Sequence, residues 1–194
     1  MFSRRKSFIG VYDSVLSKKE CERCIELFET SPQRRGTLYG DGGKTVVQDH
    51  IKSDIELYGT RFGDGSELSD LIEKGLRTAL KQYHQKHHTA LEHIEQWGVD
   101  SHYNFQKYEN SHDGFKQWHT EQGGKITSNR ILAWMIYLNN AKSGTDFLYY
   151  PTTKAKVGRC VIWPASWTHT HRSQKNKGIK YLATGWISYL GYDS

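Results

Sequence analysis

Residues 130–138 read RILAWMIYL, a continuous apolar run. A run without polar interruption is typical of a strand that is buried on both faces. Before it, residues 103–108 alternate in character, which indicates a further strand. Shorter strand-like segments follow, with turns at Gly144, Gly158 and Gly178: residues 147–150, 158–163, 168–172 and 179–190. The sequence from about residue 98 onward is therefore predicted to be β-structure.

Two helices are predicted before these strands. Ser17 is a good N-cap and Glu20 completes a capping box, so the first helix should run to about Phe28. A second helix is expected from Ser66 to about Gln96, because leucine and isoleucine recur along it at helical spacing. About eight short strands after two helices indicate the α+β class, mainly β, as an antiparallel sandwich or barrel with helices packed on one side.

The cysteines and one group of histidines are interpreted as structural. Cys21 and Cys24 lie at helical spacing in the first predicted helix, which favours a buried face over a metal or redox motif. Charged and polar neighbours predict a surface position for the histidines near the end of the second helix: His84, His87, His88 and His93. Three cysteines without disulfide-scaffold spacing are typical of a reducing compartment.

The composition excludes several classes of protein. The chain has 194 residues, of which 36% are hydrophobic and 13% aromatic, which favours one folded domain over a disordered chain. No segment is long and apolar enough to span a membrane, and the start, MFSRRKSFIG, lacks the apolar run of a secretory signal. We therefore expect a cytoplasmic protein. Its net charge of +6 is consistent with solubility, with an anionic substrate or with nucleic acid.

Residues 30–50 are rich in glycine, threonine and charge, and they include the segment 40–43, GDGG. This composition predicts a loop or hairpin, of a kind that can act as an active-site lid.

Two segments carry the candidate chemistry. Residues 118–121 read WHTE, and on a strand the side chains of His119 and Glu121 would point to the same side. His169 and His171 lie on a late predicted strand that the fold can bring alongside. Two histidines and one carboxylate on one side of a metal form the facial triad of non-haem Fe(II) oxygenases, in which other coordination positions stay open. A single His-x-Glu triplet is weak evidence by itself.

A lysine on the last predicted strand adds a second element. Lys180, followed by residues 184–186, TGW, would place a cation inside the same barrel. A buried ammonium group without an anion is costly, so this position implies an anionic ligand.

In this order the segments resemble the 2-oxoglutarate- and Fe(II)-dependent oxygenases, most closely the prolyl 4-hydroxylase-like group, which includes phage and marine bacterial versions. The motifs cover nearly the whole chain: VYDSVLSKKECERCIELFE (11–29), Tyr108 followed by GFKQWHTE (114–121), RILAWMIYLN (130–139), SGTDF (143–147), GRCVIWPASWTHTHR (158–172) and GIKYLATGW (178–186). The resemblance implies a single oxygenase domain, 1–194. Its double-stranded β-helix core, of the jelly-roll or cupin-like type, would span 98–190, with N-terminal helices on one sheet and with 1–97 as helical support and lid.

The resemblance also implies roles for polar residues. His119, Glu121 and one late histidine would bind Fe(II), and Lys180 would pair with the distal carboxylate of 2-oxoglutarate. His171 precedes Lys180 by nine residues, near the nine or ten usual in this group, whereas His169 precedes it by eleven. We therefore assign the ligand to His171. His169 is the alternative ligand, and otherwise it would line the same interior or support a ligand.

Aromatic residues would complete the pocket. Tyr108 and Tyr137 would line or hydrogen-bond 2-oxoglutarate, and Trp186 would form a wall. O2 would be the other co-substrate, with ascorbate as a further candidate cofactor. The sequence departs from the group's usual His-x-Asp motif, because Glu121 adds a methylene. We expect iron binding with a folded-back carboxylate or a shifted strand, and an altered metal site is the alternative.

The function implied is that of a dioxygenase that hydroxylates an unactivated C–H bond, with a prolyl residue of a peptide or protein as the leading substrate. The alternatives are a same-fold oxygenase acting on a free amino acid, another small molecule or a nucleic acid, and a cupin-like metal protein without oxygenase activity. Lys180, Tyr108 and Tyr137 argue against the last, because a cupin-like hydrolase needs no keto-acid clamp. No recognised nucleic-acid motif is present, and no membrane partner is expected. A phage-encoded member would lie in the host cytoplasm.

Overall fold

The computed structural model describes residues 7–39, 45–57 and 59–191. Its helices are α1 (Lys18–Glu29) and α2 (Glu67–Leu91), with short 3-10 helices at Lys125–Thr127 and Trp167–His169. The strands are β1 (Gly10–Tyr12), β2 (Gln33–Arg35), β3 (Leu38–Tyr39), β4 (Thr45–Val46), β5 (Lys52–Ser53), β6 (Ile55–Leu57), β7 (Trp97–Tyr108), β8 (Gly114–Phe115), β9 (Arg130–Tyr137), β10 (Gly144–Phe147), β11 (Thr153–Lys154), β12 (Arg159–Pro164), β13 (His171–Ser173) and β14 (Lys180–Tyr189). Among these residues no helix is long and apolar enough to cross a bilayer.

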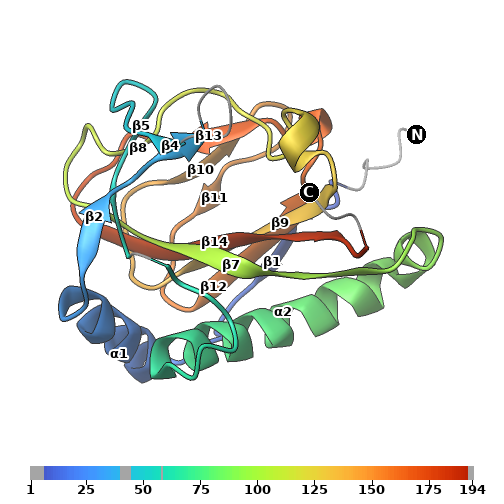
Figure 1. Ribbon diagram of the computed structural model, residues 1–194, viewed down its shortest axis with the longest axis horizontal. Coiled ribbons are helices and arrows are strands. Elements are labelled where there is room, and N and C mark those ends of the chain that lie inside the picture. The colour runs from blue at the N-terminus through green and yellow to red at the C-terminus, as the bar shows by residue number, and fades with distance from the viewer. Residues whose placement is uncertain (1–6, 40–44, 58, 192–194) are drawn as a thin grey trace.

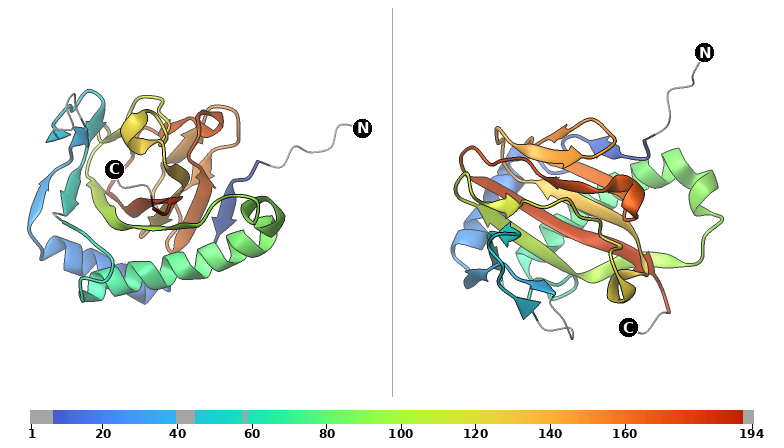
Figure 2. Two further views of the ribbon diagram at one scale, coloured as in Figure 1. Left: turned by 45° about the vertical axis from the view of Figure 1, so that its right-hand side comes forward. Right: turned by 90° about the horizontal axis from the view of Figure 1, so that it is seen from above.

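Two antiparallel sheets form the body of the fold. The larger has seven strands in the order β1-β12-β9-β14-β7-β6-β2, and the smaller has three in the order β11-β10-β13. Both helices lie along one side of the larger sheet, and the smaller sheet faces its other side (Figures 1 and 2). The predicted class, mainly β with N-terminal helices packed on one sheet, is confirmed.

Helix α1 begins and packs as its sequence predicts. The Glu20 N–H donates to Ser17 Oγ, and the Ser17 N–H donates to the Glu20 carboxylate, which completes the capping box. Cys21, Cys24 and Phe28 are fully buried, and the cysteines are free thiols. The interpretation of the Cys-x-x-Cys pair as a buried face is therefore confirmed.

Helix α2 begins after its N-cap Ser66 as predicted, but it ends at Leu91 rather than near Gln96. The backbone leaves helical geometry at His87. This side chain is buried against Tyr83 and Phe8, with ring centroids 4.6 and 5.3 Å apart. The predicted surface position is therefore wrong for His87. The local sequence does not show this burial, because Phe8 comes from a distant segment. The predicted surface position is right for the exposed His84, His88 and His93.

The segment between the helices contains more structure than its composition predicts. Strands β3 and β4 pair as a hairpin, while β2 and β6 add to the edge of the large sheet and β5 pairs with β8. The predicted glycine-rich loop at 40–43 lies outside the described residues.

Strand β9 is buried on both faces, as its apolar run predicts. Trp134 and Ile136 pack in the core beneath the helices, whereas Ala133 and Tyr137 face a second apolar interior. That second interior is lined by Tyr108, Ala133, Tyr137, Phe147, Ala155, Val161, Trp163 and Leu182. It is the interior in which the candidate site is built.

Candidate active site

Two histidines far apart in the chain are joined by their backbones. The His119 N–H donates to the His171 carbonyl oxygen at 3.0 Å, and the His171 N–H donates to the His119 carbonyl oxygen at 2.9 Å. These two hydrogen bonds form an isolated antiparallel bridge. Of residues 118–121 only His119 takes part in β-pairing, so the strand predicted there is reduced to this one bridge. His171 begins β13, whereas His169 ends a 3-10 helix. The prediction that the two late histidines share one strand is therefore wrong.

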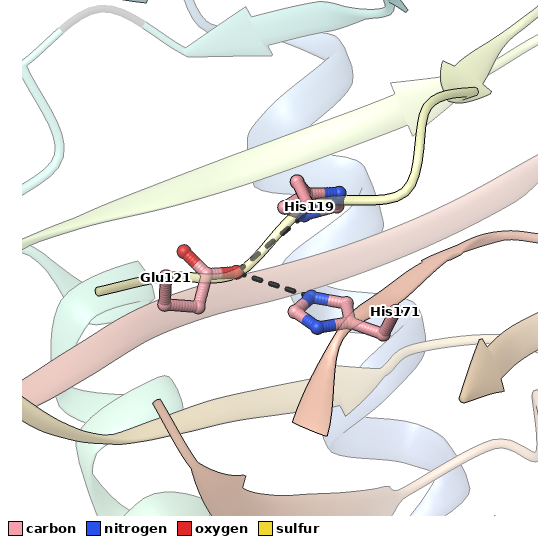
Figure 3. Close-up of side chains that lie close together, drawn as sticks. All are labelled: His119, Glu121 and His171. Carbon is pink, nitrogen blue, oxygen red and sulfur yellow. Dashed lines mark ion pairs between the residues drawn. The ribbon is translucent and has the colours of Figure 1, made fainter. Parts of the chain in front are cut away.

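Glu121 completes a group of three possible metal donors. Its Oε1 lies 3.2 Å from His171 Nε2 and 3.7 Å from His119 Nε2. One donor atom from each residue lies within 4.8 Å of the others, and Figure 3 shows the three side chains converging. Burial raises the pKa of the Glu121 carboxyl, but the contacts with the two imidazoles outweigh burial and hold that pKa well below its usual value.

A backbone carbonyl orients each imidazole. His119 Nδ1 lies 3.0 Å from the Gln117 oxygen, and His171 Nδ1 lies 3.0 Å from the His169 oxygen. A carbonyl oxygen only accepts, so in each ring Nδ1 carries a hydrogen and Nε2 is the atom directed at Glu121. An imidazole Nε2 this close to a carboxylate oxygen needs a cation between the two atoms, either a proton or a metal ion. Two imidazoles and one carboxylate fit Fe(II), which prefers this donor set when positions stay open.

Aromatic rings surround the two imidazoles. Phe115 stacks on His119 with ring centroids 3.6 Å apart. Trp163 and Phe147 lie 5.0 and 5.7 Å from the His171 ring. These rings restrict the imidazole orientations and keep the site partly dry.

His169 is buried near this group but points elsewhere. Its Nε2 lies 2.7 Å from the Ser7 carbonyl oxygen, and its ring stacks on Tyr150 at 4.9 Å. Burial lowers its pKa. Its backbone oxygen, rather than its side chain, contacts His171. Within the described chain the donor cluster includes His171 and not His169.

Lys180 lies on β14 opposite Tyr108 of β7, and it is only 1% exposed. Its Nζ lies 4.7 Å from the centroid of the Tyr108 ring. No carboxylate forms an ion pair with it in the part of the chain that the structure describes, and burial lowers its pKa to about 8. The sequence-based expectation of a cation inside the barrel thus corresponds to a buried ammonium group without a protein anion.

The remaining predicted pocket residues lie on the same interior. Tyr108 donates to Gln106 Oε1 at 3.1 Å, and the Tyr137 hydroxyl lies 2.7 Å from Thr145 Oγ1. Trp186 packs against this interior and donates from Nε1 to Glu121 at 2.7 Å. Trp186 therefore contacts the donor group directly, in addition to the predicted role as a wall of the pocket.

Sequence reasoning missed Arg130. Its Nη1 lies 3.7 Å from Glu121 Oε2, and its guanidinium carbon lies 3.6 Å from the centroid of the Trp186 ring. Its place at the start of an apolar run resembles an ordinary strand boundary. Nothing local reveals a partner that comes from another segment.

A buried charged cluster was missed as well. Lys52 contacts both Asp54 and Glu56, and all three are almost fully buried. Their i, i+2, i+4 spacing is the signal that could have found them, because alternate residues of an extended chain share a side. These three residues closely follow the segment 30–50, whose composition indicates a loop or hairpin.

The comparisons with known proteins point to one superfamily. The family model described as the 2OG-Fe(II) oxygenase superfamily matches residues 103–188, which include all the residues proposed above for metal and co-substrate. A search of curated proteins finds no significant match.

Solved structures share the fold at low identity. A prolyl hydroxylase from Trichoplax adhaerens, in complex with a peptide fragment of the hypoxia inducible factor oxygen degradation domain, superposes with a TM-score of 0.73. It is 13% identical over 94% of this chain and 84% of its own. A Pseudomonas putida prolyl-4-hydroxylase has a TM-score of 0.67 and 12% identity, over 94% of each chain.

The viral collagen prolyl hydroxylase of Paramecium Bursaria Chlorella virus-1, in a 2OG complex, has a TM-score of 0.59 and 14% identity, over 94% of this chain and 97% of its own. At such identities these likenesses establish the fold alone. Residues 103–188 match the model of the 2OG-Fe(II) oxygenase superfamily, and the chain has the double-stranded β-helix fold of the prolyl hydroxylases.

Proposed function

We propose that the protein is an Fe(II)- and 2-oxoglutarate-dependent dioxygenase that hydroxylates a prolyl residue of a peptide or protein. One observation carries the proposal: the donor group of His119, Glu121 and His171 shares an interior with Lys180, a buried cation without a carboxylate partner in the described chain. The family match supports Fe(II) and 2-oxoglutarate as the groups that this interior holds.

Each residue of the donor group would hold the metal through one atom. His119 and His171 would use Nε2, because Nδ1 is occupied by a carbonyl, and Glu121 would use a carboxylate oxygen. Bound Fe(II), with 2-oxoglutarate and O2, supplies the oxidising chemistry that places one oxygen atom in the substrate C–H bond and the other in succinate, with release of CO2. The protein contributes position and dryness.

Lys180 would bind the far carboxylate of 2-oxoglutarate. The protein has already removed the ammonium group from water, so a carboxylate that reaches it forms a charge-assisted bond in a poorly solvated site. Tyr108 lies against the ammonium group, and Tyr137 lines the same interior. Their rings would exclude water from the bound co-substrate.

A peptide substrate is supported by the surroundings of the donor group. Trp118, next to His119 in the chain, is 40% exposed, and Trp167, in the 3-10 helix before His171, is 72% exposed. Flat aromatic surfaces are the usual docking places for proline-containing segments. The solved Trichoplax adhaerens enzyme of the same fold carries a peptide fragment.

Anaerobic addition of Fe(II) and 2-oxoglutarate to the purified protein tests the co-substrate part of the proposal. We expect the weak visible charge-transfer band that a metal-bound keto acid gives. A folded protein without this band would contradict the proposal. His171→Ala should abolish the band and His169→Ala should only weaken it, while the reverse pattern would make His169 the ligand.

Succinate release across a peptide library tests the substrate part. Turnover that depends on proline at one position supports prolyl hydroxylation. Turnover only with free amino acids, other small molecules or nucleic acid would favour an alternative substrate class. Omission of ascorbate from the same assay tests whether ascorbate sustains turnover.

A further inference from the structure

The two oxygens of the Glu121 carboxylate face different partners. Oε1 faces the imidazoles, 3.2 Å from His171 Nε2. Oε2 faces the sheet and accepts a 2.7 Å hydrogen bond from the Trp186 indole N–H. The carboxylate therefore has one oxygen held by the protein and one directed at the donor group.

Arg130 reinforces the held side. Its Nη1 lies 3.7 Å from Glu121 Oε2 and donates to the Glu121 backbone oxygen at 3.3 Å. The guanidinium group stacks on the Trp186 ring, with its carbon 3.6 Å from the ring centroid. The Arg130 and Glu121 side chains are each 15% exposed, so water screens this contact weakly.

These partners come from rigid elements. Arg130 begins β9 and Trp186 lies on the adjacent β14, where it pairs with Ala133. The chain just after Glu121 is fixed as well, because Gln122 donates from its backbone to Ala165 and from its side chain to the Arg130 carbonyl oxygen. The position of Glu121 is therefore set by the large sheet.

We propose that Trp186 and Arg130 are positioning residues that hold Oε2 of Glu121, so that only Oε1 is presented to the metal. The inference rests on the proposed function, since it takes Oε1 as the metal ligand. It also explains why glutamate, with one more methylene than aspartate, fits this position. Aspartate would be shorter by one C–C bond, about 1.5 Å, and could not reach both the Trp186 N–H and the metal position.

Metal affinity in the absence of turnover tests the proposal. Anaerobic calorimetry with Fe(II) should show about 10- to 100-fold weaker binding by Trp186→Phe, which keeps the ring under Arg130 but lacks the N–H. Trp134→Phe is the matched control, because the Trp134 N–H is buried beneath the helices and has no hydrogen-bond partner among the described residues. Its Fe(II) affinity should equal that of the wild-type protein. Circular dichroism and thermal melting of each variant establish that it is folded.

A double-mutant cycle separates positioning from a general structural role. Glu121→Asp should weaken Fe(II) binding, and Trp186→Phe should add little in that background, because the aspartate has already lost the indole. Additive losses would show that Trp186 acts without Glu121 and would overturn the inference. Arg130→Lys should retain more Fe(II) affinity than Arg130→Met, since it keeps the charge near Oε2.

A metal-free measurement supplies an independent readout. The chain has 6 tryptophans, and the indole resonance that disappears in Trp186→Phe identifies the Trp186 N–H in an NMR spectrum. Glu121→Gln should shift this resonance, because it replaces a carboxylate acceptor by an amide. Absence of Fe(II) binding by the wild-type protein would overturn the proposed function together with the inference. Wild-type binding with unchanged affinity in Trp186→Phe, or an indole resonance indifferent to Glu121→Gln, would overturn the inference alone.

Discussion

Two buried lysines of this protein have opposite surroundings. Lys52 lies 3.1 Å from Asp54 Oδ1 and also contacts Glu56, so two carboxylates share its charge. Lys180 is buried more deeply and contacts the face of Tyr108, with no carboxylate paired to it in the described chain. Burying an ammonium group costs free energy in both places, but only the first cost is offset within the protein.

The difference distinguishes a charge that is balanced within the protein from one that is not. Around Lys52 the acids are in excess, so burial and the nearby Glu56 outweigh the lysine and raise the pKa of Asp54 to about 7. Around Lys180 burial alone lowers the pKa of the lysine to about 8. The Lys52 cluster holds its counter-charges within the protein, whereas the anion for Lys180 is part of the proposed function.

The largest expected effect follows from breaking the Lys52 cluster. Lys52→Met leaves Asp54 and Glu56 buried without their shared cation, so the free energy of unfolding should fall by about 3–5 kcal/mol. Urea denaturation at neutral pH measures this change. A loss below about 1 kcal/mol would show that the acids relax by taking up protons or by contacting Arg34, which lies 3.6 Å from Glu56.

Lys180→Met should have the opposite effect on the ligand-free protein. A pKa lowered from 10.5 to about 8 corresponds to a cost of about 3 kcal/mol while the lysine is charged in both states. The variant should therefore be more stable than wild type below pH 8. Between about pH 8 and 10.5 the unfolded chain binds more protons than the folded one, so wild-type stability rises and the gap closes. Denaturation of both proteins from pH 7 to 10 checks this, and a constant gap contradicts it.

The same substitution should weaken 2-oxoglutarate binding. Loss of one charge-assisted bond is worth about 1.5 to 3 kcal/mol, or about ten- to a hundredfold in affinity. Calorimetric titration of 2-oxoglutarate into the anaerobic Fe(II) protein measures the dissociation constant. Equal binding by wild type and Lys180→Met would remove Lys180 from the co-substrate site.

The smallest effect is expected at an exposed lysine. Lys18 pairs with Glu22 at 3.6 Å, and the two side chains are 79% and 57% exposed. Lys18→Met should change stability by less than about 0.5 kcal/mol and leave 2-oxoglutarate binding unchanged. A larger change would show that replacement of any lysine by methionine, rather than burial, produces the effects at Lys52 and Lys180.

The sequence predicts the parts of the fold that depend on local patterns. The capping box at Ser17 and the apolar run of β9 are local signals, and both correspond to elements in the structure. A hairpin was one of the two structures expected for residues 30–50, and β3 and β4 form one. Strands β2, β5 and β6 were missed, because they are two or three residues long and β5 and β6 pair with strands far along the chain. The burial of His87 was missed for the same reason, since Phe8 is remote in sequence.

Within the candidate site, the sequence identifies the motif residues but does not predict their contacts with one another. His119 and Glu121 were singled out by residue type and spacing and His171 by the family resemblance, and the structure brings the three together. The contacts of Trp186 and Arg130 with Glu121 depend on how β9 and β14 lie beside a separate loop. No pattern within one segment could indicate them.

The backbone bridge between His119 and His171 has a consequence for how the protein would acquire its metal. Main-chain hydrogen bonds join the two ends of the chain segment between these histidines, which contains strands β9 to β12. The entropy of joining those ends is therefore lost when the chain folds and not when an ion arrives. An ion would enter a framework assembled in advance, so chelation and reloading should be fast and reversible, and one divalent ion should exchange for another without refolding.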